Sequence, residues 1–199
     1  MTEKSTNLTK HTTKNPIGRA FLNNFLKTVV KTTRPLNIDS ILDVGCGEGF
    51  TLERLRKEKI GESYEGLEYD DTAVALAKKM NPKVIIKKGD IYKLPYKDNY
   101  FDLVVCTEVL EHLDNPRKAY KELIRVSKKY ILLSVPNEPF FTIQRMARFQ
   151  NILHLGAHPE HIQHWTARAF LKFVHVRGVK LVIRRFPIPW TMIVLKKVK

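Results

Sequence analysis

ILDVGCGEGF, at residues 41–50, is the stretch that decides the fold. The apolar run 41–44 predicts a buried strand, and Gly45, Gly47 and Gly49 follow it at alternate positions. Glycine lets the backbone turn sharply and approach a ligand closely, as in the first strand-to-helix turn of nucleotide-binding folds. The stretch therefore predicts an α/β unit with a ligand site at the turn.

Carboxylates around the glycines indicate the charge of the ligand. A dinucleotide fingerprint, G-x-G-x-x-G, binds an anionic pyrophosphate and needs no acid beside it. Here the third glycine comes one residue earlier, and Asp43 and Glu48 bracket the turn. Acids there would repel a pyrophosphate but suit a cation that carries ammonium and sulfonium groups. Glu68 ends the next predicted strand, where an acid accepts ribose hydroxyls, and Asp90 ends the third, where an acid can accept the adenine amino group.

Strands and helices alternate outward from this turn. Helical patterns at 49–59, 71–80, 116–127 and 166–176 separate the apolar runs 41–44, 64–68, 84–88, 101–106, 130–135, 179–186 and 191–197. Asn15-Pro16 is typical of a helix start, and the apolar period of 17–30 predicts an N-terminal helix that ends before Pro35. This alternation indicates a largely parallel sheet with helices on both faces.

Four segments together resemble the successive motifs of class I S-adenosylmethionine-dependent methyltransferases: ILDVGCGEGF, YEGLEYD, KKGDIYKLPYKDNYFDLVVCTEVLEHL and KYILLSVPNEP. The resemblance covers residues 38–137 closely. It implies a doubly wound, Rossmann-like seven-stranded sheet, mostly parallel with an antiparallel last strand, and S-adenosylmethionine as methyl donor. It implies donor contacts at Asp43, Gly45, Cys46, Gly47, Glu68, Tyr69, Asp90 and Ile91. It places Glu108 at the end of the fourth strand, beneath the methyl group.

We expect one domain over residues 16–199, after a flexible basic tail at 1–15. Within it, the resemblance implies a lid helix at 16–35 and a donor-binding core at 36–137. An acceptor-side insert and the last strands would fill 138–199.

The turn after the fourth strand is the predicted acceptor site, because open parallel sheets bind ligands beyond the carboxyl ends of their strands. Glu108, Glu111 and His112 have the spacing that places side chains on one side of a short helical turn. This face could hold a divalent cation, or His112 and Glu111 could be the catalytic residues, with His112 as general base. The alternative is that Glu111 and His112 cap the turn and pack on the donor.

A second histidine-rich segment follows at 154–164, and His161 stands four residues before Trp165. The pattern E-x-x-E-H with a later histidine resembles the small-RNA 3′-terminal 2′-O-methyltransferases. Its first half also resembles the ubiquinone-pathway catechol O-methyltransferases. The resemblance implies a magnesium or manganese site at Glu108, Glu111, His112 and His161, which would chelate two neighbouring hydroxyls and lower the pKa of the attacked one.

Positive charge gathers at the two ends of a chain whose net charge is +15. Residues 1–35 hold seven Lys or Arg and one acid, and residues 140–199 hold eleven and one acid, whereas 36–139 is nearly neutral. Basic ends around a neutral core suggest an anionic partner, either RNA or an anionic membrane surface. The alternative is that these side chains only keep the protein soluble.

From these features we expect O-methylation of a small-molecule or lipid acceptor, such as a quinone precursor or a polar lipid. The amphipathic helix at 17–30 and the sequence FPIPW at 186–190 would suit peripheral membrane contact. RNA 2′-O-methylation is the alternative, with Phe140, Phe141, Phe149 or Trp165 stacked on bases. A third possibility is a donor-binding interaction module that has lost catalysis.

Compartment and assembly follow from what the chain lacks. No apolar run long enough to span a membrane and no signal-peptide pattern occur, so we expect a cytoplasmic protein. Cys46 and Cys106 form no Cys-x-x-Cys pair and are expected to stay reduced. The oligomeric state is left open.

Overall fold

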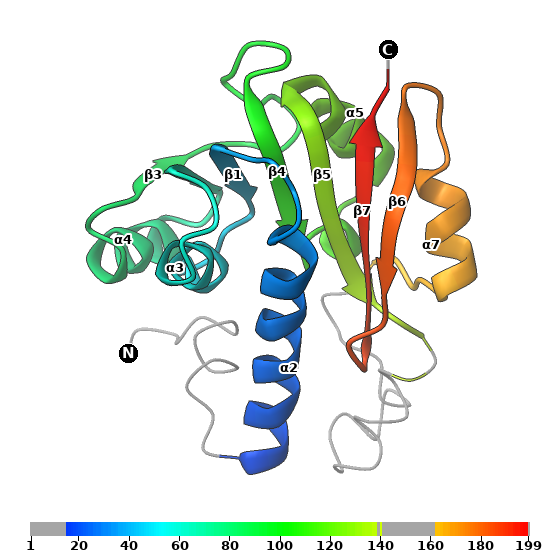
Figure 1. Cartoon of the computed structure of the whole chain (residues 1–199), viewed down its shortest axis with the longest axis horizontal. Coiled ribbons are helices and arrows are strands. Elements are labelled where there is room, and N and C mark those ends of the chain that lie inside the picture. Colours follow the sequence, from blue (N-terminus) through cyan, green and yellow to red (C-terminus); the bar gives the residue numbers. More distant parts are fainter. Residues whose placement is uncertain (1–14, 139, 141–161, 199) are drawn as a thin grey trace.

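A seven-stranded sheet with helices on both faces forms the body of the protein (Figure 1). The computed structural model describes residues 15–138, 140 and 162–198. The strands are β1 (Ser40–Val44), β2 (Ser63–Glu68), β3 (Ile85–Lys88), β4 (Phe101–Thr107), β5 (Ser127–Pro136), β6 (Val179–Arg185) and β7 (Trp190–Lys197). The helices are α2 (Pro16–Thr33), α3 (Phe50–Lys57), α4 (Asp71–Met80), the 3-10 turn η1 (Leu110–His112), α5 (Pro116–Val126) and α7 (Ala167–Val174).

The strand order is β3-β2-β1-β4-β5-β7-β6. Strands β1 to β5 are parallel, and β7 runs antiparallel to both of its neighbours, β5 and β6. The predicted fold class is therefore confirmed, including the antiparallel last strand. That strand lies inside the sheet and leaves β6 at the edge.

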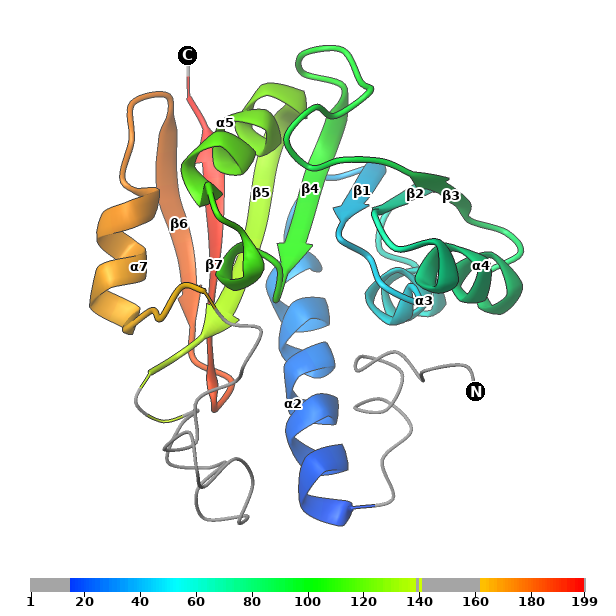
Figure 2. The ribbon, with the colours of Figure 1, turned by 180° about the vertical axis from the view of Figure 1, so that it is seen from behind.

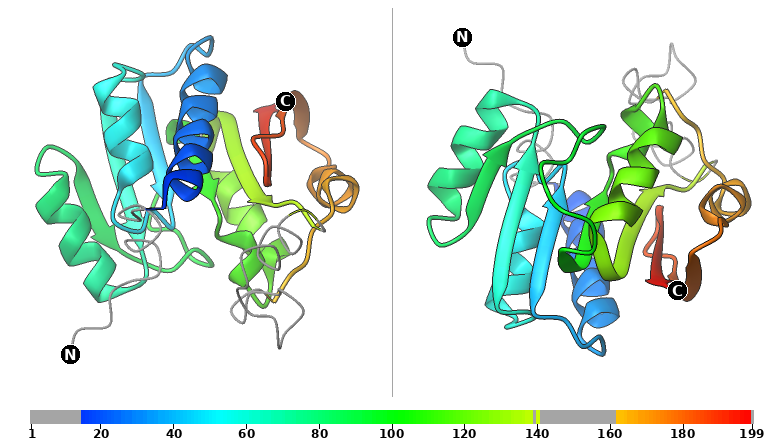
Figure 3. Two further views of the ribbon diagram at one scale, coloured as in Figure 1. Left: turned by 90° about the horizontal axis from the view of Figure 1, so that it is seen from below. Right: turned by 90° about the horizontal axis from the view of Figure 1, so that it is seen from above.

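The two faces of the sheet are covered by different helices (Figures 2 and 3). One core layer joins α2, α3 and α4 to the sheet, and the other joins α5 and α7. Alternate residues of β4 serve the two layers: Leu103 and Val105 face the first, and Val104 and Cys106 face the second. A strand buried on both faces explains the continuous apolar run of β4 in the sequence.

Helix α2 begins where the sequence predicts it. The Asn15 side chain accepts hydrogen bonds from the amides of Ile17 and Gly18, and Pro16 takes the first helical position. Its C-terminal half packs on the sheet through the buried Phe25 and Val29. The N-terminal half extends past the edge where the parallel strands end (Figure 1).

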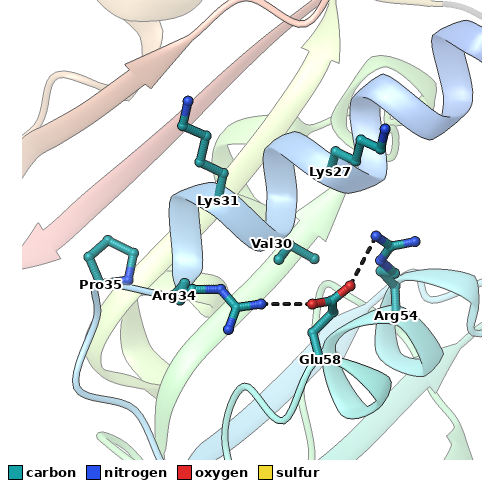
Figure 4. A pocket seen from close by; sticks show the side chains of 7 residues that line it. All are labelled: Lys27, Val30, Lys31, Arg34, Pro35, Arg54 and Glu58. Atoms are coloured by element: carbon teal, nitrogen blue, oxygen red, sulfur yellow. Dashed lines mark hydrogen bonds and ion pairs between the residues drawn. The ribbon is translucent and has the colours of Figure 1, made fainter.

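A hollow lined by basic side chains lies where α2 meets α3 (Figure 4). The Glu58 carboxylate accepts ion pairs from Arg34 at 2.7 Å and Arg54 at 3.0 Å, so it joins the end of α2 to α3. Lys27 and Lys31 add positive charge to the same hollow. Because these side chains are partly exposed, each ion pair contributes about 1 kcal/mol at most.

The strand order has a switch point at the carboxyl ends of β1 and β4, and we call the region between the loops that follow these two strands the crevice. From β1 the chain proceeds outward to β2 and β3, then returns to the other side of β1 as β4. Ligands of open α/β sheets bind at such a reversal of strand order, between the loops that follow the two strands. Here those loops are the glycine turn after β1 and the turn η1 after β4.

Candidate active site

The glycine turn after β1 is built from left-handed residues. Gly45 has φ +72° and Gly49 has φ +81°. The Leu67 carbonyl accepts hydrogen bonds from the amides of Gly45 (2.7 Å) and Cys46 (3.2 Å), which holds the turn against β2. A Cβ atom on Gly49 would lie 2.6 Å from the Asn81 side-chain nitrogen, so the close approach of Asn81 explains why the third glycine comes early.

Glu68 ties the glycine turn to the loop after β2. One carboxylate oxygen accepts from the Gly47 amide at 2.8 Å. The other accepts from the amides of Tyr69 at 2.7 Å and Asp70 at 3.1 Å. The predicted donor-binding acid is therefore held at the carboxyl ends of β1 and β2, beside the glycine turn that forms one side of the crevice.

Asp43 lies under the glycine turn and is almost completely buried, with 1% of its surface exposed. Its Oδ1 has no hydrogen-bond partner in the part of the chain that the structure describes. Burial, together with the nearby charge of Glu68, raises the pKa of Asp43 to about 8. A buried carboxyl group in this state would be stabilised as an anion by a cationic ligand.

The other predicted donor contacts differ in exposure. Tyr69 is 74% exposed, and Asp90 is exposed with a carboxylate oxygen that accepts from the Tyr92 amide at 2.8 Å. Ile91 and Cys46 are buried. Burial, with the charges of Asp43 and Glu68, raises the pKa of Cys46, so its thiol stays protonated and is no nucleophile.

The acceptor turn packs directly on the glycine turn. A Cβ atom on Gly45 would lie 2.4 Å from Val109 Cγ2, so only glycine fits beneath this valine. Glu108, the residue before, has φ +58°. Its two carboxylate oxygens accept hydrogen bonds from the Ser134 hydroxyl at 2.9 Å and from the Trp190 indole at 2.5 Å. The end of β4 is thus locked to β5 and β7.

Glu111 and His112 lie side by side in η1 but in different surroundings. Glu111 is 1% exposed, and both carboxylate oxygens are shielded from solvent. Its charge and that of Asp43 add to burial in raising the pKa of Cys106. His112 is half-buried, which suits it better than Glu111 to meet an acceptor in the crevice.

The segment that follows the predicted histidine ligand docks on this turn. The amides of Ile162 and Gln163 both donate to the Glu111 carbonyl at 2.9 Å, and the Gln163 side chain donates to the Leu113 carbonyl at 3.2 Å. The two sequence-distant segments therefore meet at residues 111–113 and 162–163. His161 itself lies outside the described residues, as do Phe141 and Phe149.

The predicted metal site stays a prediction. Among the described residues, no group of three or more His, Cys, Asp or Glu side chains is placed to hold one ion. Glu108 also directs both carboxylate oxygens to Ser134 and Trp190. The described residues alone thus do not form the predicted metal site.

Three further residues contact this part of the molecule, and the sequence pattern assigns none of them to the active site. Trp190 binds Glu108 and also contacts the Phe25 ring of α2, with ring centroids 5.0 Å apart. Ser134 is buried at the end of β5. His164 lies 3.9 Å from the Glu138 carboxylate, across the crevice side of β5. Only the alternation of β5 and β7 could have indicated which of their side chains face Glu108.

Comparison with known proteins agrees with this geometry. Residues 42–132 match the family model described as a methyltransferase domain. This central part of the chain therefore resembles a methyltransferase domain. A probable S-adenosylmethionine-dependent methyltransferase of Mycolicibacterium smegmatis is 33% identical over 104 residues, a match that covers 51% of this chain and 40% of that protein. The chain thus spans less than half the length of relatives of this kind.

Two other methyltransferases that resemble this chain have different acceptors in their names. The ubiquinone biosynthesis O-methyltransferase of Coxiella burnetii is 27% identical over 157 residues, which cover 70% of this chain and 66% of that protein. The solved structure of the small RNA methyltransferase HEN1 has a TM-score of 0.72 at 18% identity and covers 89% of this chain and 25% of that one. At that identity the likeness concerns the fold.

Proposed function

We propose that this protein transfers the methyl group of S-adenosylmethionine to an oxygen atom of a small-molecule or lipid acceptor. The contact between Gly45 and Val109 carries the proposal. It brings the carboxylate-lined turn after β1 against the turn that bears His112, so the two sides of one crevice have complementary chemistry. A cationic donor held on the first side would present its methyl group to the second.

The donor would be held by this chain's own carboxylates. The Glu68 oxygen that accepts only the Gly47 amide retains a lone pair for a ribose hydroxyl. The buried Asp43 would lie near the positive charge of the donor and become ionised when the donor binds. The exposed Tyr69 ring and the Asp90 carboxylate would meet the adenine.

The transfer is a single displacement. The acceptor oxygen attacks the methyl carbon in line with the sulfur, the new O–C bond forms as the C–S bond breaks, and S-adenosylhomocysteine leaves. His112 accepts the proton of the acceptor hydroxyl. Alignment of the two reactants in the crevice supplies much of the rate, because it removes the entropic cost of bringing them together.

The test is methyl transfer from isotopically labelled donor into fractionated cell extract, with lipid, small-molecule, RNA and protein pools separated afterwards. We expect label in the lipid or small-molecule pool and none with the Glu68→Ala variant. Label confined to RNA would reassign the acceptor. No label in any pool, with donor binding intact, would make the protein a donor-binding interaction module.

RNA is the second candidate acceptor, and the docked segment 162–163 favours it. The small-RNA methyltransferase resemblance expects residues near His161 to approach η1, and the amides of Ile162 and Gln163 bond to Glu111 there. Against it, Trp165 packs within the protein, with its ring centroid 4.7 Å from that of Phe173. A tryptophan packed in this way has less ring surface for stacking on a base.

A further inference from the structure

We infer that the edge of the molecule that carries the active-site crevice docks on an anionic lipid surface. The inference rests on the proposed function in one respect: a lipid acceptor would be reached at that surface. The docking itself is a separate property, and it is measured without any acceptor.

Exposed apolar side chains gather at this edge from distant parts of the chain. Ile17, in the first turn of α2, is 58% exposed, and Phe186 and Ile188, in the turn between β6 and β7, are 48% and 60% exposed. Two views show that the start of α2 and the β6–β7 turn both lie at the edge where β4 and β5 end (Figures 1 and 2). Large apolar residues exposed together on one side indicate a binding surface.

Arginines, and no acids, stand beside these apolar residues in the two segments of the chain that carry them. Arg19 follows Ile17 in α2, and Arg184 and Arg185 precede Phe186. Helix α2 contains no Asp or Glu, and neither does the stretch 162–198. The Arg184 guanidinium lies 5.6 Å from the centre of the Phe186 ring, so one side chain supports the other. A surface of this composition complements anionic headgroups with hydrocarbon beneath them.

The aliphatic side chains favour a lipid surface over RNA. Ile17 and Ile188 have no aromatic ring to stack on a base, and their exposure is of no use to phosphate binding. At a bilayer interface the same side chains enter the acyl region while the arginines remain among the headgroups. Within the described part of the chain, no helix is both long enough and apolar enough to cross a bilayer, so the contact proposed is with the surface.

The experiment is co-flotation of the full chain with vesicles of phosphatidylcholine alone or mixed with phosphatidylglycerol, at low and physiological salt. We expect binding only to the mixed vesicles and weaker binding as salt rises. Arg184→Glu/Arg185→Glu should reduce binding by at least about tenfold, since each basic residue at the surface contributes about 1 kcal/mol. The matched control is Lys180→Glu, a charge reversal at the other end of β6, which should keep most of the binding.

A second pair of variants tests insertion. Ile17→Ser/Ile188→Ser should lose binding to mixed vesicles, whereas Ile85→Ser, on the opposite sheet edge and 56% exposed, should not. A polarity-sensitive dye on Ile188→Cys should shift to the blue with mixed vesicles, and one on Ile85→Cys should not. Equal losses in the test and control variants would overturn the inference.

RNA binding is measured in parallel with a single-stranded oligonucleotide. If the arginine variants weaken RNA binding while wild-type protein ignores mixed vesicles, the edge is an RNA surface and the inference is wrong. Calorimetric titration with S-adenosylmethionine separates this failure from that of the proposed function, because the docking variants lie outside the donor site. If wild-type protein does not bind S-adenosylmethionine, the proposed function is wrong, and vesicle binding stands as an independent result.

Discussion

At the scale of single residues, Glu68 does two tasks with one carboxylate. It organises the glycine turn and the loop after β2 through three backbone amides, and it is the predicted partner of the ribose hydroxyls. The free protein therefore already holds this acid in its binding position. A ligand that meets a preorganised site avoids the cost of ordering it.

Replacement of Glu68 should weaken donor binding. Glu68→Ala should raise the donor Kd about tenfold or more, because charge-assisted hydrogen bonds contribute about 1.5–3 kcal/mol. Glu68→Gln keeps the shape and an acceptor oxygen, so it should lie between Ala and wild type. Isothermal calorimetry measures both, with circular dichroism as the check on folding. Unchanged affinity in a folded Glu68→Ala protein would remove this residue from the donor site.

Asp43 predicts a pH dependence of donor binding. Its pKa in the folded protein is about 8, raised above the usual 3.8 by burial and then by Glu68, so folding favours the protonated form. Stability should therefore fall as pH rises from about 4 to about 8, whereas donor affinity should rise over the same window because the cation favours the carboxylate. Calorimetry in buffers of different ionisation enthalpy should detect proton release, and Asp43→Asn should abolish it. A flat affinity profile would contradict this assignment.

Trp190→Phe should affect turnover and spare donor binding. The phenyl ring keeps the contact with Phe25 but cannot donate to Glu108, so the carboxylate loses one of its two anchors. We expect kcat to fall about tenfold, the effect of losing one hydrogen bond to a charged group, with donor Kd unchanged. Steady-state kinetics on the acceptor that the extract fractionation identifies, with calorimetry alongside, separates the two constants. A normal kcat would show that the Glu108 anchor is dispensable.

At the scale of elements, the contact between the turns after β1 and β4 sets the geometry of the crevice. Neither turn is positioned by its own sequence alone, since Val109 fits only because Gly45 has no side chain. In the sequence, the glycine motif predicts a ligand site at this turn. The structure adds that the same glycine makes room for the acceptor turn.

Gly45→Ala should lower the stability of the protein by more than backbone strain alone explains. Gly178 provides the control, because it has φ +90° and nothing within 4 Å of an added Cβ, so Gly178→Ala reports strain alone, about 1–2 kcal/mol. Gly45→Ala adds the collision with Val109. Val109→Ala in the Gly45→Ala background should recover that excess stability in chemical denaturation and part of the lost turnover. Equal losses at the two glycines would show that the Val109 contact is soft.

At the scale of the whole molecule, Lys197 connects the last strand to the end of α5 and to the segments next to it through hydrogen bonds. Its ammonium donates to the Asn99 side chain at 2.7 Å and to the carbonyls of Ile124 at 2.8 Å and Ser127 at 2.9 Å. One side chain thus joins the end of β7, the end of α5 and the loop before β4. Burial lowers the pKa of this lysine.

Lys197→Met should destabilise the protein by about 1.5 kcal/mol, because the exposed Asn99 oxygen and two part-buried carbonyls lose a charged donor. Lys196→Met is the control. Lys196 is the neighbouring residue on β7 and is exposed, so its replacement should change the stability by about 0.5 kcal/mol at most. Differential scanning calorimetry should show a drop of about 2–4 °C per kcal/mol for a chain of this size. A similar drop for both variants would assign the effect to strand charge alone.

The order of strands and helices was predictable because apolar periods and glycine turns alternate clearly from residue 41 onward. The position of the predicted donor acids at one edge follows for the same reason, since parallel strands bring their carboxyl ends to one edge, whereas their contact with the donor stays a prediction. The hydrogen bond between Trp190 and Glu108 was not, because 82 residues separate them and only the pairing of β5 with β7 brings them together. The inference of lipid docking also depends on the structure, because the sequence alone does not show that the segments with Ile17 and Ile188 lie on one side of the molecule.

The position of β7 between β5 and β6 determines when strand β6 can pair during synthesis. Chains emerge from the N-terminus, and strands β1 to β4 find every sheet partner within their own span except β5, which follows next in the chain. Strand β6 is made before β7, yet β7 is its one neighbour among the described strands. During translation the backbone of β6 therefore stays unpaired until β7 has been synthesised, whereas strands β1 to β5 can already pair with one another. A pause at that moment leaves β6 open to chaperones and to the same strand on the next nascent chain of a polysome.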